Sequence, residues 1–315
     1  MCCLFGMVNY SGMKNPIADE LVNYLAQEST IRGMHSTGIA YNKNGKLVVY
    51  KKPKNAYDMN FQGLKECVCV MGHTRHATQG SHTKNYNNHP FKGKCINAKF
   101  ALAHNGVLWN DATLRKQYNL PTVKIETDSY IAVQLLEDIG TLDINNVSRM
   151  AELVQGSFTF TLLDDTNKLW IVKGDNPISI IHFPQFGMYA YASTSQILFT
   201  ALSRTDLVED IASGDFHMLT INDGDIITID KDGVIQAYKF NFDMYGAWGY
   251  NWQSYNTTTQ KNYWETDYDT DYLESIKAVA RGMGFDDDDI MELYNDGYTL
   301  DEIEDFIYSF YPNRK

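Results

Sequence analysis

The stretch Met1-Cys2-Cys3-Leu4-Phe5-Gly6 opens the chain and decides how the rest of it is interpreted. Removal of the initiator methionine would leave Cys2 with a thiol nucleophile and a free α-amine on one residue. An unperturbed α-amine titrates near ~8 and a thiol near ~8.5, so the amine is a suitable base for the thiol at neutral pH. Residues 4–8 form an apolar run typical of a buried strand, and Gly6 leaves room for a close neighbour. The stretch therefore predicts a buried strand that begins at a nucleophile.

Composition indicates a globular protein with a sizeable core. The chain has 315 residues, of which 44% are hydrophobic and 13% aromatic. Its five cysteines are an odd number, which favours reduced thiols over a disulfide framework. No apolar run approaches the ~18 residues that span a membrane, and the N-terminus lacks the features of a signal peptide. We therefore expect a cytoplasmic protein without membrane contact.

The negative charge is concentrated at the C-terminal end. Residues 241–315 contain 16 acidic and five basic residues, whereas the first 240 residues are nearly neutral. Neither part offers a basic face for a phosphate backbone, so direct nucleic-acid binding is not expected. The acidic end is therefore interpreted as a separate unit of the chain.

The pattern along the chain predicts an α+β layered domain over residues 1–240. Many short strands alternate with a few amphipathic helices, and Asn44-Gly45 marks a hairpin turn. Residues 241–270 are rich in aromatic side chains and are interpreted as a linker. Residues 271–315 predict a small acidic all-α unit, in which Asp286 begins one helix and Thr299 another. This unit is either a stabilising appendage or an adaptor for a partner.

Cys67 and Cys69 raise the alternative of a metal site. Zinc sites need a second Cys or His pair at similar spacing, and the sequence offers none. Both residues lie in the apolar run at 67–71, where alternate side chains share one face of a strand. We expect both thiols in a core, and neither a metal nor a cofactor.

Four chemically specific groups lie at the ends of predicted elements. Cys2 begins a strand, and Arg75 follows another in a glycine-bounded loop suited to reading a carboxylate. Asn105-Gly106 follows a third strand, where an amide and a backbone N–H can form an oxyanion hole. Asp128 lies at a helix start, available to an ammonium group. Alone, each is equally a surface pair, a turn or a cap; together they describe an amidase for an amino acid side chain.

The order of these motifs resembles the class II glutamine amidotransferase family, in particular the glutaminase domain of glucosamine-6-phosphate synthase. The resemblance covers roughly residues 2–232 and includes further motifs around the four groups, namely Arg32-Gly33, Gly72 to Gly80, Asn88-His89-Pro90, His104-Asn105-Gly106 and Glu126-Thr127-Asp128. It implies a four-layer αββα sandwich of the N-terminal-nucleophile hydrolase type.

The resemblance also implies a role for each group. Cys2 would attack the glutamine side-chain amide and form a γ-glutamyl thioester, with its own amine moving the proton. Asn105 and the backbone N–H of Gly106 would hold the oxyanion. Arg75 would bind the α-carboxylate of the substrate, and Asp128 its α-ammonium group.

Further positions carry over with departures from the family pattern. The resemblance implies that His76, Thr78 and His89 line and close the substrate pocket. The family has Gly after the nucleophile where this chain has Cys3, which would either crowd the site or add a second thiol. The family's Trp after the arginine is His76 here, and its later His is Gln79.

The sequence therefore predicts a glutamine-hydrolysing subunit that passes ammonia to a separate synthase or ligase. No phosphate loop or second catalytic motif follows the first 240 residues. One alternative is an N-terminal-cysteine amidase for a γ-glutamyl or other amide substrate, although Arg75 and Asp128 suit a free amino acid better. Another is a non-catalytic glutamine-binding or scaffold module, which retention of Met1 would favour.

Overall fold

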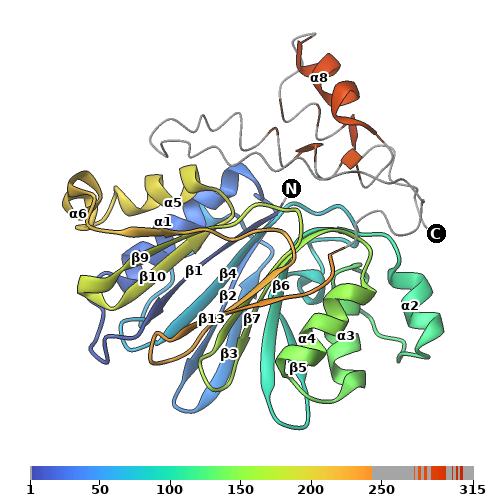
Figure 1. The fold of residues 1–315 in the computed structure, drawn as a ribbon, viewed down its shortest axis with the longest axis horizontal. Helices are drawn as coiled ribbons and strands as arrows, with labels where there is room; N and C mark the ends of the chain where they lie inside the picture. Colours follow the sequence, from blue (N-terminus) through green and yellow to red (C-terminus); the bar gives the residue numbers. More distant parts are fainter. Residues whose placement is uncertain are drawn as a thin grey trace.

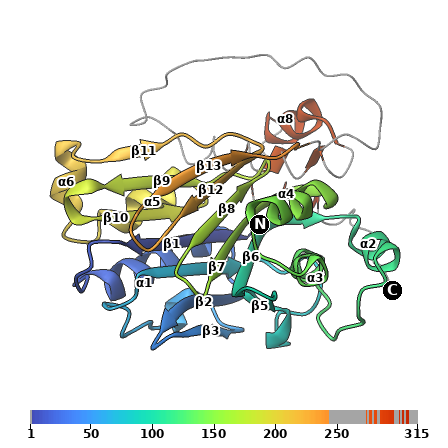
Figure 2. The same cartoon turned by 60° about the horizontal axis from the view of Figure 1, so that its bottom comes forward.

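The computed structural model describes one continuous body and part of the acidic C-terminal end. The described residues are 2–242, 273, 276, 277, 280, 281, 285–295, 300, 303, 306 and 307. Within residues 2–242, two antiparallel sheets lie face to face, and helices cover both outer faces (Figures 1 and 2). The predicted four-layer αββα sandwich is confirmed.

The first sheet is organised around the strand that follows Cys2. It has seven strands in the order β11 (His217–Leu219), β9 (Ser179–Phe183), β10 (Met188–Ala192), β1 (Cys3–Asn9), β4 (Cys69–Arg75), β2 (Ser36–Lys43) and β3 (Lys46–Lys52). The β2–β3 hairpin turns at the predicted Asn44-Gly45, where both residues have positive φ. Because β1 pairs with β10 on one side and β4 on the other, Cys2 directly precedes a central strand of this sheet.

The second sheet is built from later parts of the chain. It has six strands in the order β13 (Ile235–Lys239), β12 (Asp225–Ile229), β8 (Leu169–Lys173), β7 (Gly156–Asp164), β6 (Lys99–Leu108) and β5 (Phe91–Lys94). Near its edge, β6 pairs with β7 along its whole central part, whereas β5 pairs with β6 only from Lys99 to Leu102. Within residues 2–242, one edge of β6 is therefore without a strand partner beyond Leu102.

Helices form the two outer layers. Those on the first sheet are α1 (Ala18–Glu28), α5 (Ser195–Leu202) and α6 (Val208–Ser213), and those on the second are α2 (Asp111–Gln117), α3 (Tyr130–Ile139) and α4 (Ile144–Leu153). Short 3-10 turns complete the connections: η1 (Ser29–Ile31), η2 (Ala56–Asp58), η3 (Asn85–Asn87) and η4 (Pro184–Phe186). The alternation of each strand sends one set of side chains to its helices and the other set to the opposite sheet.

A dry layer joins the two sheets. Its buried members come from both sheets and include Leu4, Val8, Ala40, Met71, Ala101, Ala103, Leu163, Ile171 and Tyr191. Gly6 lies in this layer, where a β-carbon would be 2.2 Å from the carbonyl oxygen of Val70 and 2.6 Å from the hydroxyl of Tyr191. The predicted close neighbour of Gly6 is therefore the adjacent strand β4 together with a tyrosine of β10.

Two strands differ from their predicted bounds. The strand predicted over residues 67–71 begins at Cys69 and runs to Arg75, and the strand before Asn105 continues through it to Leu108. Arg75 and Asn105 therefore lie within strands, and not in loops that follow them. Cys67 and Cys69 are both buried as predicted, but Cys67 packs on the helix side of the first sheet and Cys69 between the sheets. Their predicted common face is wrong because Cys67 precedes the strand.

Part of the predicted acidic helical unit is described. Helix α8 (Asp287–Asn295) begins after Asp286. The Asp286 carboxylate accepts the backbone N–H of Asp289 at 2.8 Å, and the Asp289 carboxylate accepts the backbone N–H of Asp286 at 2.8 Å. This reciprocal cap confirms Asp286 as the start of a helix. A small apolar cluster surrounds Ile290 and includes Leu273, Ile276, Ala280, Leu300, Ile303 and Ile307. Most of the predicted linker, and Thr299, lie outside the described residues.

We predict that Gly6→Ala destabilises the sandwich, because the new methyl group collides with a backbone carbonyl that cannot rotate away. Overpacking of this kind costs about 1–3 kcal/mol of unfolding free energy. Urea denaturation measures the change. Met7→Leu, on the next residue and the opposite face, is the matched control and should cost under about 1.5 kcal/mol. Equal stability of Gly6→Ala and the native chain would contradict the packing described for β1.

Candidate active site

Cys2 lies at the start of β1 and is half-buried. Its Sγ donates to the carbonyl of His76 at 3.5 Å, and its own carbonyl accepts a hydrogen bond from Arg32 Nε at 3.2 Å. Burial raises the pKa of the Cys2 thiol, and the positive charge of Arg75 opposes this rise. The thiol is thus anchored by backbone contacts and lies within the field of a guanidinium group.

Cys3 lies outside this site. Strand alternation turns its side chain to the opposite face of β1, where it is 0% exposed in the core between the first sheet and its helices. Its Sγ donates to the carbonyl of Leu4 at 3.4 Å. A side chain at the position where the family has Gly therefore neither crowds the nucleophile nor places a second thiol beside it.

Arg75 ends β4, the strand that pairs with β1 beside the nucleophile. Its side chain is buried, and its guanidinium donates to Asn88 Oδ1 at 2.9 Å and to the Gly80 carbonyl at 3.0 Å. Among residues 2–242 it forms no ion pair. A buried cation held only by neutral acceptors is well placed to bind an incoming carboxylate.

Asn105 and Gly106 lie in the middle of β6. Asn105 is completely buried, and neither its amide nitrogen nor its amide oxygen has a hydrogen-bond partner in the described part of the chain. Gly106 has φ of +137°, and a β-carbon there would lie 1.9 Å from the carbonyl oxygen of Ser157. Because a buried unpaired amide costs about 1–3 kcal/mol, its retention points to a ligand that uses it.

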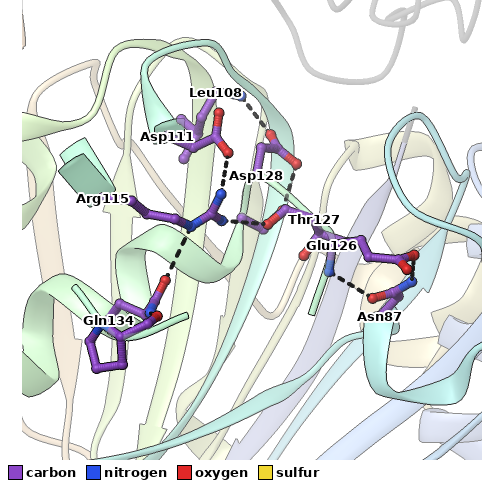
Figure 3. A network of polar contacts seen from close by, with 10 residues as sticks. Asn87, Leu108, Asp111, Arg115, Glu126, Thr127, Asp128 and Gln134 are labelled. Carbon is purple, nitrogen blue, oxygen red and sulfur yellow. Dashed lines mark hydrogen bonds and ion pairs between the residues drawn. The ribbon is translucent and has the colours of Figure 1, made fainter. Parts of the chain in front are cut away.

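Asp128 precedes α3 and is buried. Its Oδ2 accepts the backbone N–H of Leu108 at 2.7 Å (Figure 3), and its Oδ1 lies 3.4 Å from the Ser129 hydroxyl. The N-cap of α3 is Ser129, so Asp128 lies one residue before the cap. Burial raises the pKa of Asp128 to about 6, because the Leu108 N–H compensates only part of the lost hydration.

An arginine network fixes the chain that leads to Asp128. Arg115 binds Asp111 at 2.7 Å within α2, and its other nitrogens donate to Gln134 Oε1 and to the Thr127 carbonyl, both at 3.3 Å. Figure 3 shows this guanidinium between α2 and the start of α3. Arg115 therefore ties the residue before Asp128 to both α2 and α3. The sequence motif did not reveal these contacts.

The loop of residues 76–90 covers this end of the sandwich. His76 packs against His35 with ring centroids 4.7 Å apart, and burial lowers its pKa to about 3. Thr78 is half-buried in the same loop. Asn87 donates to Glu126 Oε2 at 2.8 Å and accepts the Glu126 backbone N–H at 2.9 Å, which joins the loop to the segment before Asp128 (Figure 3).

His89 is part of the interior and not of an exposed rim. Its ring is buried against His73, at 4.2 Å between centroids, and against Phe91 at 4.4 Å. Lys51 of β3 donates to the carbonyls of Asn88 and Pro90 on either side of it. Burial lowers the pKa of Lys51 to about 7, so this amine sits near its titration point at neutral pH.

The structure thus brings the predicted groups to one end of the inter-sheet layer. Cys2 and Arg75 come from paired strands of the first sheet, and Asn105 and Gly106 from the second. Asp128 is bonded to the end of the same β6 strand. In the described residues, no group of three or more His, Cys, Asp or Glu side chains is arranged to hold a metal ion. A search of the described helices finds none long and apolar enough to cross a bilayer.

Solved structures share this fold. Glutamine phosphoribosylpyrophosphate amidotransferase from B. subtilis superimposes with a TM-score of 0.61 over 77% of this chain and 50% of that chain, at 20% identity. The allosteric regulatory enzyme of purine biosynthesis gives the same TM-score at 19% identity. The two-sheet sandwich of residues 2–242 is therefore a fold that these solved structures share.

Sequence relatives define the family. The model of the class II glutamine amidotransferases matches residues 1–181, and the chain belongs to this family. The isomerizing glutamine–fructose-6-phosphate aminotransferase of Halalkalibacterium halodurans is 29% identical over 238 residues, which cover 73% of this chain and 38% of the relative. Its counterpart in Staphylococcus aureus is 28% identical over 243 residues, covering 73% and 36%. The chain thus spans less than two fifths of these relatives, and the family and enzyme class predicted from the sequence are confirmed.

We predict that Asp128→Asn gains stability relative to the native chain as pH rises from 4 to 8. The folded pKa is raised above the unfolded value near ~3.9, so the native chain loses stability as Asp128 ionises and is fully penalised above pH ~6. An uncharged amide avoids this penalty of up to about 3 kcal/mol. Chemical denaturation at pH 4, 6 and 8 measures it. Asp138→Asn, on an exposed position of α3, should show no such trend, and a pH-independent difference at Asp128 would refute the assignment.

Proposed function

We propose that the chain hydrolyses the side-chain amide of glutamine through a Cys2 thioester and passes the ammonia to an acceptor on a separate partner enzyme. The observation that carries the proposal is the completely buried amide of Asn105, which has no hydrogen-bond partner among the described residues and lies in the same inter-sheet layer as Arg75. Family membership supports glutamine as the substrate. The domain that would do this is residues 1–240, with 241–270 as its linker and 271–315 as the unit that meets the partner.

The first half-reaction would form the thioester. With Met1 removed, the α-amine of Cys2 accepts the thiol proton while Sγ attacks the amide carbon of the substrate. The oxyanion would then form beside Asn105 Nδ2 and the backbone N–H of Gly106, since fixed donors of this kind stabilise the developing charge. Collapse of this intermediate breaks the C–N bond, and the ammonium form of the amine protonates the departing ammonia.

The second half-reaction would release glutamate. The neutral amine of Cys2 takes a proton from water, and the hydroxide attacks the thioester carbon. The same two donors stabilise the second oxyanion, and the C–S bond breaks to give the carboxylate and the free thiol. Throughout, Arg75 would bind the α-carboxylate and Asp128 the α-ammonium group, so that the reacting amide stays at Sγ.

The loop of residues 76–90 would close the site during these steps. The His76 carbonyl is already in contact with Cys2 Sγ, and Thr78 lies two residues further on. His89 would support this loop from the interior. Exclusion of bulk water while the ammonia departs keeps it unprotonated, which transfer to an acceptor requires, and the water that hydrolyses the thioester would enter afterwards.

The matches to the aminotransferases named above cover 73% of this chain and leave the rest of it without a counterpart in the match. The aromatic-rich and acidic residues after position 240 are therefore our candidates for contact with a partner that uses the ammonia.

Steady-state release of glutamate and ammonia from glutamine tests the proposal. We expect Cys2→Ala to abolish turnover and Asn105→Ala to lower kcat by about 10²–10³-fold. Cys3→Ala is the matched control, because its thiol lies in the opposite core, and it should keep native activity per folded site. Turnover that persists in Cys2→Ala would exclude the thioester route.

Measurements of intact mass and of substrate preference distinguish the proposed glutaminase from a γ-glutamyl amidase and from a non-catalytic binding module. We expect mass spectrometry to show loss of Met1, since a blocked amine cannot act as the base. Faster turnover of γ-glutamyl peptides than of free glutamine would replace the proposed substrate with a peptide. A protein that retains Met1, binds glutamine and releases no ammonia would instead be a binding module.

A further inference from the structure

A hydrogen bond between side chain and backbone links the two sheets directly beside the site. His73, in β4, lies two residues before Arg75 and shares its strand face, and it is 1% exposed. Its Nε2 lies 2.9 Å from the carbonyl oxygen of His104 in β6. Because β5 pairs with β6 only as far as Leu102, this carbonyl lies on an edge that β5 leaves open.

The link continues from the second sheet to the start of α3. His104 Nδ1 lies 2.8 Å from the Ser129 hydroxyl, and that hydroxyl lies 3.4 Å from Asp128 Oδ1. His104 is 1% exposed, Ser129 is 4% exposed, and the His104 ring packs on Phe160 with centroids 4.7 Å apart. A continuous chain of hydrogen bonds therefore runs through the interior from β4 to Asp128.

Hydrogen-bond chemistry fixes the tautomer at the first link of this chain. A carbonyl only accepts, so His73 must carry its proton on Nε2. The bond between His104 Nδ1 and the Ser129 hydroxyl can form in either direction, because a hydroxyl both donates and accepts. Burial lowers the pKa of each histidine to about 3, which keeps both neutral at ordinary pH.

We propose that His73, His104 and Ser129 are positioning residues that fix the three substrate-reading groups relative to one another. Each adjoins one of those groups: His73 shares a strand face with Arg75, His104 precedes Asn105, and Ser129 follows Asp128. The proposal rests on the proposed function, because it needs these groups to bind the carboxylate, the amide and the ammonium of one molecule. It adds residues that do not touch the substrate.

Two observations favour positioning over simple stabilisation. The apolar contacts of the inter-sheet layer are non-directional, so they do not define how far β4 and β6 are displaced along each other. The 2.9 Å hydrogen bond from His73 Nε2 to the His104 carbonyl is directional and does define this displacement. In addition, His73 Nδ1 is buried without a partner in the described residues. Apolar side chains of similar size would pack here without that cost.

Kinetics of matched variants in the full chain test the proposal. His73→Leu keeps the bulk and removes the donor, whereas His73→Gln keeps an N–H at nearly the same reach. We expect His73→Leu to lower kcat/KM for glutamine by about 10-fold or more, and His73→Gln to stay within about 3-fold of the native chain. Rates are counted per reactive site, titrated with an electrophilic glutamine analogue that alkylates Cys2. Equal losses in both variants would overturn the proposal.

Ser129 gives a second, independent pair that does not depend on His73 variants folding. Ser129→Ala removes the hydroxyl that orients Asp128, and we expect mainly a higher KM with kcat little changed. Ser129→Thr keeps the hydroxyl and should restore the native KM. A loss of stability in Ser129→Ala without any change in KM would mark the residue as structural only, and would overturn its positioning role.

Binding and NMR separate failure of this proposal from failure of the proposed function. In a Cys2→Ala background, calorimetry should show weaker glutamine binding for His73→Leu than for His73→Gln, whether or not the native chain hydrolyses glutamine. Nitrogen-15 spectra of labelled histidine should show the Nε2–H tautomer for His73. The opposite tautomer at His73 would overturn the hydrogen-bond chain even if glutamine is hydrolysed as proposed.

Discussion

The burial of polar groups between two sheets is the constraint on which this structure depends. Most of the inter-sheet layer is apolar, with Leu4, Met71 and Ala103 among its members, and it supplies the free energy that keeps the sheets together. At the end nearest Cys2 the same strand faces carry Arg75 and Asn105. Burying a charged group such as Arg75 and an unpaired amide such as Asn105 lowers the free energy of unfolding. The apolar remainder of the inter-sheet layer offsets this loss.

Arg75 connects this interior to the covering loop. Its guanidinium bonds to Asn88 and to the Gly80 carbonyl, while Asn87 of the same loop is bonded to Glu126. The loop is thus attached both to the first sheet and to the segment that carries Asp128. Any ligand that draws Arg75 toward itself must also alter the bonds that hold the loop, so binding and covering of the site are mechanically linked.

The sequence predicts the framework of this fold well where apolar alternation is clear. The buried strand that follows Cys2 and the hairpin at Asn44-Gly45 are found as predicted. Polar residues inside strands concealed the true ends of β4 and β6, because His73, Arg75 and Asn105 interrupt the apolar pattern that marks a strand. The polar residues of the site are therefore also the reason why the apolar pattern did not show where these two strands end.

Long-range contacts were beyond reach of the sequence. In the sequence Asp128 lies at the start of a predicted helix, but in the structure its carboxylate accepts the backbone N–H of Leu108, which is 20 residues away. Helix α4 was not predicted, since Asn145, Asn146 and Ser148 weaken the helical signal in its first turns. The roles of the motif residues came from family resemblance, whereas the contacts of His73, His104 and Ser129 became visible only when the two sheets were placed face to face.

The alternation of β1 has a consequence for the chemistry of the thiols. Cys3 faces one core, and Cys67, Cys69 and Cys95 are buried elsewhere, so Cys2 alone among the five cysteines reaches solvent. An oxidised Cys2 has no neighbouring thiol on its own face with which to form a disulfide, and its sulfenic acid would proceed to irreversible products unless an external thiol intervened. The folded protein therefore presents one accessible thiol, and that thiol is also its proposed nucleophile.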